Sequence, residues 1–228
     1  MFKTSEECRL ELRAYSVGVV DEFAAEGDLD YMPASAARAS FGKEDKTGQD
    51  PAADKKLMKY LANHKHMTPF EYQHATFLIE CPLFIRSQIH RHRTFSYNEI
   101  SRRYTEENLE FWIPTKFRKQ STSNRQASID EEVFDADDRR SLFQVSCEAA
   151  LEDYKELLAY GVCREQARAV LPQSLLTKFY MGGNLRNWAH FVELRRDSHA
   201  QPEVQIVANR IAGKLQELWP ESCKALGI

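Results

Sequence analysis

The run from Arg91 to Tyr104, RHRTFSYNEISRRY, concentrates side chains that bind anions. Its five cations or imidazoles stand beside two serines, an asparagine and a single carboxylate, Glu99. The planar, permanently charged fork of arginine matches phosphate with two hydrogen bonds, and hydroxyl and amide donors can orient a polar ligand. The run therefore predicts an anion-binding site that receives a substrate. A solvated basic face that binds nothing is the alternative interpretation.

Arg91-His92-Arg93, followed after seven residues by Ser101, resembles the signature of the flavin-dependent thymidylate synthases. Other positions of the run match in register, and further blocks of the chain resemble the family in the same order. These positions and blocks are Ser96, Asn98, Glu99 and Arg103, with residues 36–41, 66–71, 164–172 and 194–201. The resemblance covers nearly the whole chain, and residues 120–138 are the main unmatched stretch.

The resemblance implies a mixed α/β (α+β) fold in one domain over residues 1–228, with a mainly antiparallel sheet flanked by helices. It implies reductive methylation of dUMP to dTMP, in which methylenetetrahydrofolate donates the one-carbon unit. NADPH would reduce FAD, and the reduced flavin would supply hydride. The resemblance also implies a homotetramer with active sites between subunits.

Arg164 and Arg168 are four residues apart and fall on one face of a predicted helix. Like charges at this spacing repel each other, so we expect an anion nearby. A structural ion pair with Glu165 is the alternative. The resemblance assigns Arg168 to the nucleotide phosphate, together with Ser101 and with Arg103 from a neighbouring subunit.

Arg195 is the catalytic residue that the resemblance implies. A preorganised guanidinium would stabilise negative charge that develops at N3 and at the carbonyl edge of the pyrimidine. An arginine that neutralises a helix C-terminus is the alternative. The full dUMP set by resemblance is Gln88, Ile89, His90, Arg91, Glu99, Ile100, Ser101, Arg102, Arg103, Arg168 and Arg195.

The flavin is not held in a Rossmann manner, because no G-x-G-x-x-G follows a predicted strand. The family often has an asparagine where His190 stands, so the chain departs from the pattern there. His66 is expected to flank the flavin or the folate, with a packed or solvated histidine as the alternative. By resemblance the FAD contacts are Ser40, Thr68, Arg91, His92, Arg93, Glu99, Asn184, Leu185, Arg186, His190 and His199.

The composition favours an enzyme over a nucleic-acid-binding module. The chain has 228 residues, 43% of them hydrophobic, which allows one large core. Its net charge is -3, whereas a general nucleic-acid binder is normally strongly basic. In the nucleic-acid alternative, arginines of the run 91–104 would contact the backbone while its aromatic residues stack on bases.

The five cysteines are scattered and show no paired spacing, so a reducing cytoplasm fits best. None has the neighbours that a thiolate nucleophile needs. Ser101 lacks an evident base and is interpreted as a ligand for the nucleotide. The histidine pairs His64/His66 and His90/His92 have no spaced carboxylate, so no metal site is expected. No window is apolar enough for a membrane span or an export signal.

Periodicity and capping signals predict the elements that must position these residues. Gly182-Gly183 is expected to turn the chain and Asn184 to cap the following helix, while Thr68-Pro69-Phe70-Glu71 has the form of a capping box. A helix over residues 83–92 would place Arg91-His92-Arg93 at its C-terminus. Strands are expected at 9–17, 74–81 and 175–181, and helices at 53–63, 129–160 with a break near Asp137, 164–170, 185–196 and 202–219. Residues 106–125 are expected to be irregular.

Overall fold

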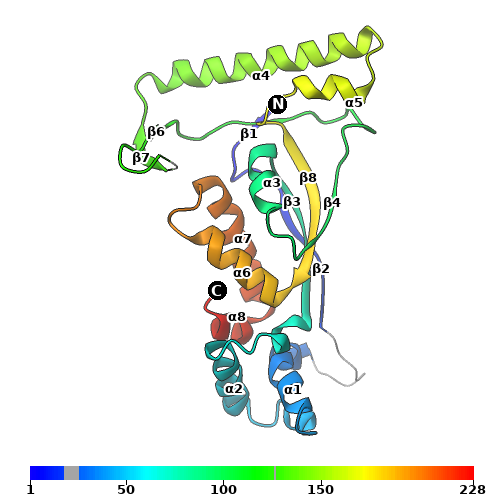
Figure 1. Ribbon diagram of the computed structural model, residues 1–228, viewed down its shortest axis with the longest axis vertical. Coiled ribbons are helices and arrows are strands. Elements are labelled where there is room, and N and C mark those ends of the chain that lie inside the picture. Colours follow the sequence, from blue (N-terminus) through cyan, green and yellow to red (C-terminus); the bar gives the residue numbers. More distant parts are fainter. Residues whose placement is uncertain (18–25, 126) are drawn as a thin grey trace. The chain divides into compact units, whose positions relative to one another are not determined.

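The computed structural model describes residues 1–17, 26–125 and 127–228. They form the expected mixed α/β fold, with a mainly antiparallel sheet flanked by helices (Figure 1). The chain divides into two compact units, each assembled from separate stretches. Unit 1 comprises Met1–Arg9, Ile79–Arg91 and Asn98–Phe179, and unit 2 comprises Leu10–Leu78, His92–Tyr97 and Tyr180–Ile228. A single domain over residues 1–228 stays a prediction.

The described strands form three sheets. The largest has four strands in the order β2 (Leu10–Val17), β3 (Gln73–Pro82), β8 (Leu176–Asn184) and β4 (Ser96–Glu99). A parallel pair joins β1 (Phe2–Lys3) to β5 (Phe111–Trp112), and an antiparallel pair joins β6 (Arg118–Gln120) to β7 (Ser128–Glu132). The predicted strands at 9–17, 74–81 and 175–181 are confirmed.

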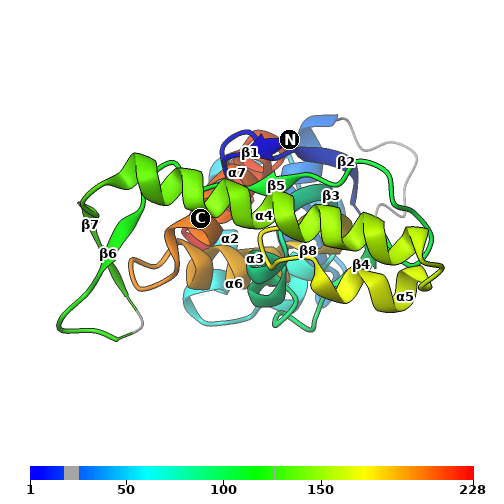
Figure 2. The same ribbon diagram turned by 90° about the horizontal axis from the view of Figure 1, so that it is seen from above.

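Unit 1 holds the helices α3 (Leu83–Ile89), α4 (Ala136–Ala159) and α5 (Arg164–Ala167), followed by a 3-10 turn at Arg168–Val170. Figure 2 shows α5 running alongside the C-terminal part of α4. Gly161, at φ +85°, lets the chain turn between them, as a glycine after a helix end does. The core of unit 1 contains two groups of buried residues. One is Cys8, Trp112 and Leu176, and the other is Phe111, Cys147 and Leu175.

Unit 2 is mostly helical. Its helices are α1 (Met32–Ala39), α2 (Pro51–Asn63), α6 (Leu185–Arg196), α7 (Pro202–Leu218) and α8 (Pro220–Leu226), with 3-10 turns at Glu26–Tyr31, Glu44–Lys46 and Thr68–Glu71. Helix α6 packs on α7, and α2 packs on α8 (Figure 1). Trp188 on α6 is fully buried, and its ring lies 5.0 Å from that of Phe77 and 4.5 Å from that of Phe95. This aromatic group fixes α6 against the chain that follows His92.

The helix predictions at 53–63, 185–196 and 202–219 are confirmed within two residues, although α8 follows where the last of them was expected to close the fold. Asn184 caps α6, because its side-chain oxygen accepts the N–H of Asn187 at 3.0 Å. The turn expected at Gly182-Gly183 is wrong, since both glycines continue β8. A Cβ at Gly183 would lie 2.5 Å from the ring of Phe95, so this glycine makes room for an aromatic side chain.

Four other local predictions are corrected. Residues 128–132 form β7, which pairs with β6, and α4 then runs from Ala136 without a break at Asp137. Residues 106–125, which were expected to be irregular, contain the two short strands β5 and β6. Thr68 begins a 3-10 turn without a capping box, because the carboxylate of Glu71 accepts a hydrogen bond from Arg186 instead. The helix expected at 164–170 is split into α5 and a 3-10 turn.

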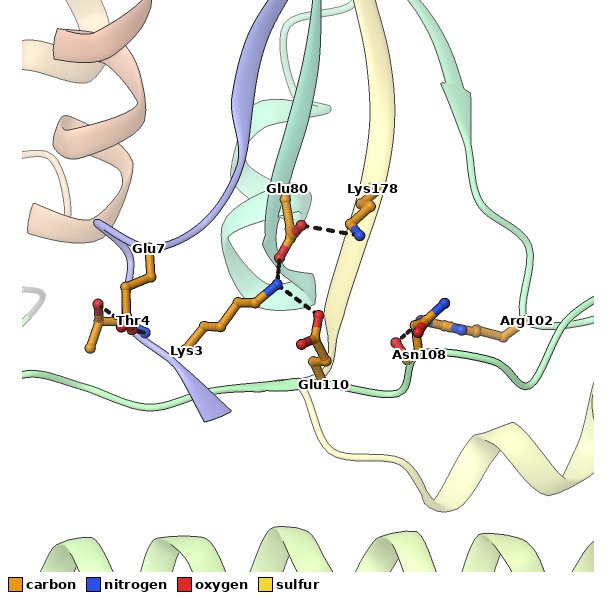
Figure 3. A network of polar contacts seen from close by, with 8 residues as sticks. All are labelled: Lys3, Thr4, Glu7, Glu80, Arg102, Asn108, Glu110 and Lys178. Carbon is orange, nitrogen blue, oxygen red and sulfur yellow. Dashed lines mark hydrogen bonds and ion pairs between the residues drawn. The ribbon is translucent and has the colours of Figure 1, made fainter. Parts of the chain in front are cut away.

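A buried carboxylate connects three segments of unit 1 (Figure 3). Glu80 on β3 is 2% exposed and pairs with Lys3 of β1 at 2.9 Å and with Lys178 of β8 at 3.3 Å. Lys3 also pairs with Glu110 at 2.7 Å. Burial of a carboxylate requires such partners, so this group connects β1 with β3 and β8. Across the ranges that the structure covers, no helix has the length and apolarity to cross a membrane.

Candidate active site

The basic run lies where the sequence places it. Helix α3 ends at Ile89, so Arg91-His92-Arg93 follows its C-terminus directly, and β4 then carries residues 96–99. The N–H of Ile100 donates to the carbonyl oxygen of Lys178 at 2.9 Å, which extends the contact with β8 beyond β4. A helix and a strand therefore position the run from both ends.

The predicted dUMP residues lie in unit 1, apart from Arg195 in unit 2. The predicted flavin residues lie in unit 2, apart from Arg91 and Glu99 in unit 1. Within unit 2, the structure brings together His92, which follows α3, and Arg195, which ends α6. The Nε–H of Arg195 donates to Nε2 of His92 at 2.9 Å.

His92 must be neutral to accept this hydrogen bond. Burial, followed by the charge of Arg195 and by His190, lowers the pKa of His92 to about 4. Its ring is 8% exposed, and its centroid lies 4.9 Å from that of Phe191 and 6.1 Å from that of His190. The hydroxyl of Tyr97 donates to the carbonyl oxygen of His92 at 2.8 Å. His92 is thus held on both its ring and its backbone, and its Nε2 faces the guanidinium.

Glu99 has two hydrogen-bond donors in unit 1. Nε of Arg86 on α3 lies 3.0 Å from Oε1 of Glu99, and Oγ1 of Thr177 on β8 lies 2.7 Å from the same oxygen. Neither Arg86 nor Thr177 is among the site residues that the sequence predicts. The one sequence feature that could have indicated Arg86 is its position as a lone arginine in the predicted helix. No local sequence feature indicates Thr177 as a site residue.

The arginines expected at the phosphate lie near the surface of unit 1. Arg103 pairs with Glu165 at 3.1 Å, and Arg164 pairs with Glu106 at 3.1 Å. All four side chains are about half exposed, so these pairs contribute little and an arriving anion can replace them. The alternative in which Glu165 pairs with its helix neighbours is not the observed arrangement. Arg168 is exposed, whereas Arg102 is partly buried and bonds the carbonyl oxygens of Glu107 and Asn108.

A cleft of about 1060 Å³ opens in unit 2. Arg186 and His190, both predicted flavin contacts, line it from α6, and Thr94 and Asn187 face it as well. Lys65 and Arg196 add two further cations that the sequence analysis did not place at the site, and the acids are Glu193 and Asp197. The cleft is as large as a site for a dinucleotide-sized ligand requires.

The other predicted flavin residues of unit 2 vary in how much a ligand could use them. Ser40, Thr68 and Arg93 are exposed. His199 is exposed and its Nδ1 lies 2.8 Å from Asp197, one of the acids at the cleft. The side-chain oxygen of Asn184 is committed to capping α6, so its amide group is the part that could contact a ligand.

Two predicted contacts have side chains inside the core. Ile89 and Leu185 are both 0% exposed, so in this conformation only their main-chain groups could reach a ligand. His90 is partly buried, and its ring packs 4.9 Å from that of Phe179. Burial, followed by the charge of Arg86, lowers the pKa of His90 below its ordinary value. This packing on Phe179 gives His90 a structural role next to the run 91–104.

Two of the cysteines do not resemble nucleophiles. Cys81 and Cys223 are buried, and burial raises the pKa of Cys81 well above its usual range and that of Cys223 to about 12. A thiol with a raised pKa is a poor source of thiolate. In the ranges described here, no three histidine, cysteine or acidic side chains gather as metal ligands would.

Comparison with known proteins identifies the family. The model of the family described as "Thymidylate synthase complementing protein" matches residues 24–221. The chain is 44% identical over 199 residues to the flavin-dependent thymidylate synthase of Thermosipho africanus, covering 86% of this chain and 85% of the relative. It is 39% identical over 220 residues to that of Kosmotoga olearia, covering 95% and 93%.

A solved structure has the same fold. The UMP/dUMP methylase PolB from Streptomyces cacaoi, bound with 5-Br dUMP, superposes with a TM-score of 0.83 at 28% identity, covering 99% of this chain and 96% of that one. These matches define the class of protein, a methyltransferase enzyme of mixed α/β fold. The chain belongs to the flavin-dependent thymidylate synthase family. None of the matches supports the nucleic-acid-binding alternative.

Proposed function

We propose that the chain converts dUMP to dTMP by reductive methylation, with FAD as its flavin, NADPH as reductant and methylenetetrahydrofolate as one-carbon donor. The observation that carries the proposal is the hydrogen bond from Arg195 to the buried, neutral ring of His92. It fixes a guanidinium in one orientation, as stabilisation of a developing negative charge requires.

The dUMP residues of unit 1 fit an anionic nucleotide. Arg91, Arg103 and Arg168 expose charged groups, and Ser101 adds a hydroxyl next to Arg102. Arginine forks and a hydroxyl are a suitable donor set for a phosphate monoester. In the proposal Ser101, Arg103 and Arg168 bind the phosphate, while Gln88 and Glu99 orient the rest of the nucleotide. Ile89, His90, Ile100 and Arg102 support the run that carries these contacts.

Arg195 acts on the pyrimidine. Carbon six of the uracil ring must become electrophilic before it can accept hydride, and charge then accumulates at N3 and the carbonyl edge. A guanidinium beside that edge stabilises this charge without having to reorganise, because His92 already holds it. His92 therefore enters the proposal as the residue that orients Arg195 as well as a flavin contact.

The residues of unit 2 fit a flavin nucleotide. Its pyrophosphate needs cations and hydrogen-bond donors, and Lys65, Arg186 and Arg196 line the cleft there. When bound, reduced FAD supplies the hydride. The protein would hold the cofactor through Ser40, Thr68, Arg91, His92, Arg93, Glu99, Asn184, Leu185, Arg186, His190 and His199. Arg186 is presented to the cleft by its pair with Glu71.

The proposal includes a homotetramer with active sites between subunits and a cytoplasmic location. Family membership supports the assembly. Arg103 is half exposed, which is what a residue that reaches a neighbouring subunit needs.

The test is formation of dTMP from dUMP by the flavin-loaded protein with NADPH and methylenetetrahydrofolate, measured by chromatography. Arg195→Lys should lower kcat by about a hundredfold or more, because a point charge cannot replace an oriented fork. Arg13→Lys is the control and should keep kcat within about threefold, since Arg13 is an exposed residue of β2 that pairs with Glu11 and belongs to neither proposed binding set. Loss of dTMP formation in wild type, or equal effects of both variants, would contradict the proposal.

A further inference from the structure

We infer that Arg86 and Thr177 are positioning residues that hold Glu99 in one orientation, so that its carboxylate receives a hydrogen-bond donor of the bound nucleotide. The inference rests on the proposed function, because it gives Glu99 a nucleotide partner. It extends that function to two residues outside the matched run, one on α3 and one on β8.

Both hydrogen bonds to Glu99 end on the same oxygen. Arg86 Nε and Thr177 Oγ1 approach Oε1 at 3.0 Å and 2.7 Å. A carboxylate accepts at two oxygens, and two donors on one of them fix the plane of the group and direct Oε2 away from them. Oε2 is therefore the oxygen that the nucleotide's donor, a sugar hydroxyl or a ring N–H, would meet.

The environment of the three residues favours positioning over a loose surface pair. Thr177 is 4% exposed, and the side chains of Glu99 and Arg86 are 21% and 33% exposed. The hydroxyl of Thr177 is thus set by β8, while Arg86 is set by α3. Strand β8 is itself anchored, since Lys178 beside Thr177 pairs with Glu80 and accepts the N–H of Ile100 on its carbonyl oxygen. Helix α3 is anchored at its start, where the N–H of Leu83 donates to the carbonyl oxygen of Leu175 at 3.1 Å.

A nucleotide needs a preset carboxylate because a flexible one would have to be ordered on binding. Glutamate has three rotatable bonds, and ordering such a side chain costs conformational entropy. Because Arg86 and Thr177 order Glu99 when the chain folds, this entropy is not lost again when the nucleotide binds. Their loss should weaken dUMP binding while leaving the chemistry of the ring, which depends on Arg195, nearly unchanged.

The test uses the flavin-loaded protein and compares Thr177→Val, which removes only the hydroxyl, with Thr177→Ser, which keeps it. Thr177→Val should raise the Kd and the KM for dUMP by about five- to twentyfold and change kcat by less than about threefold. Thr177→Ser should stay within about threefold of wild type. Arg86→Gln is a second route to the same loss if Thr177→Val does not fold, as judged by thermal melting.

A double-mutant cycle separates positioning from a general structural effect. Glu99→Gln should weaken dUMP binding, and Thr177→Val added to it should cause little further loss, because the hydroxyl acts through the carboxylate. Equal losses with and without Glu99, or wild-type dUMP binding by both Thr177→Val and Arg86→Gln, would overturn the inference and leave the proposed function standing. Absence of dUMP binding in wild type would instead overturn the proposed function and this role with it.

Discussion

Arg195 and His92 are 103 positions apart in the chain, and the Nε–H of Arg195 donates to Nε2 of His92 at 2.9 Å. The histidine comes from the signature run and the arginine from the end of α6. Burial of His92 keeps the ring neutral, so that Nε2 can accept and Nδ1 carries the proton. A residue expected only at the flavin therefore also orients the residue expected to do the catalysis.

Protonation of His92 should destabilise the protein in acid. The pKa of His92 is about 4 in the folded chain and 6.5 in the unfolded one, so the unfolded state binds the proton first as the pH falls. The contribution of His92 to the free energy of unfolding should decrease between pH 6.5 and about 4 by about 3 kcal/mol and then level off. Denaturant titrations across this interval measure the change.

His92→Gln is the matched variant for this measurement. Its amide oxygen can still accept from Arg195, but it does not titrate. Other buried groups, His90 among them, contribute equally to both proteins. The difference between the two stability curves therefore reports His92 alone, and parallel curves would show that its neutral form is not required by the fold.

Ser101 is expected to bind the nucleotide and not to attack it. Ser101→Ala should raise the Kd for dUMP by about tenfold, the effect of one hydrogen bond to a charged group, and leave most of kcat. Calorimetric binding and steady-state kinetics on the same preparation separate the two effects. Turnover abolished at unchanged dUMP affinity would assign Ser101 to the chemistry instead.

Glu80 should be the most sensitive charged residue of unit 1. Glu80→Gln removes the charge that Lys3 and Lys178 share, and we expect a loss of about 2 kcal/mol in the free energy of unfolding, because Glu80 is buried while the lysines are partly exposed. Glu217→Gln is the control, since its pair with Lys214 is exposed and should contribute less than about 0.5 kcal/mol. Similar losses in both variants would refute a special role for the buried group.

Gly183 should tolerate no side chain. Gly183→Ala would place a Cβ 2.5 Å from Phe95, whose ring packs on Trp188, and overpacking of this kind costs about 1–3 kcal/mol. Gly213→Ala on α7 meets open space and should stabilise the protein by up to about 1 kcal/mol through helix propensity. Thermal melts of the two variants should therefore shift in opposite directions.

Local signals were sufficient for much of the fold. Asn184 was predicted as a cap because a cap depends on residues within one turn of it, and the helix that it begins follows from its apolar spacing. The position of the basic run after α3 was predictable for the same reason, whereas β4 was not expected. Gly182-Gly183 was misinterpreted because the residue that requires a glycine, Phe95, is far away in the sequence.

The contacts that define the candidate site join residues that are far apart in the sequence. Thr177 donates to Glu99 over 78 positions of sequence, and no pattern near either residue indicates the pair. Residues 129–132 were expected to be helical because their own sequence does not show that β6 will pair with them. Spacing and family resemblance named the residues of the run, and the structure adds which side chains hold them.

The most direct test of the account is the response of the bound flavin to dUMP. The purified protein would be loaded with FAD and mixed anaerobically with NADPH, with and without dUMP, while the flavin absorbance is followed by stopped flow. We predict a yellow protein whose flavin band bleaches faster when dUMP is present. A protein that does not bind FAD, or whose flavin is reduced at the same rate without dUMP, would contradict it.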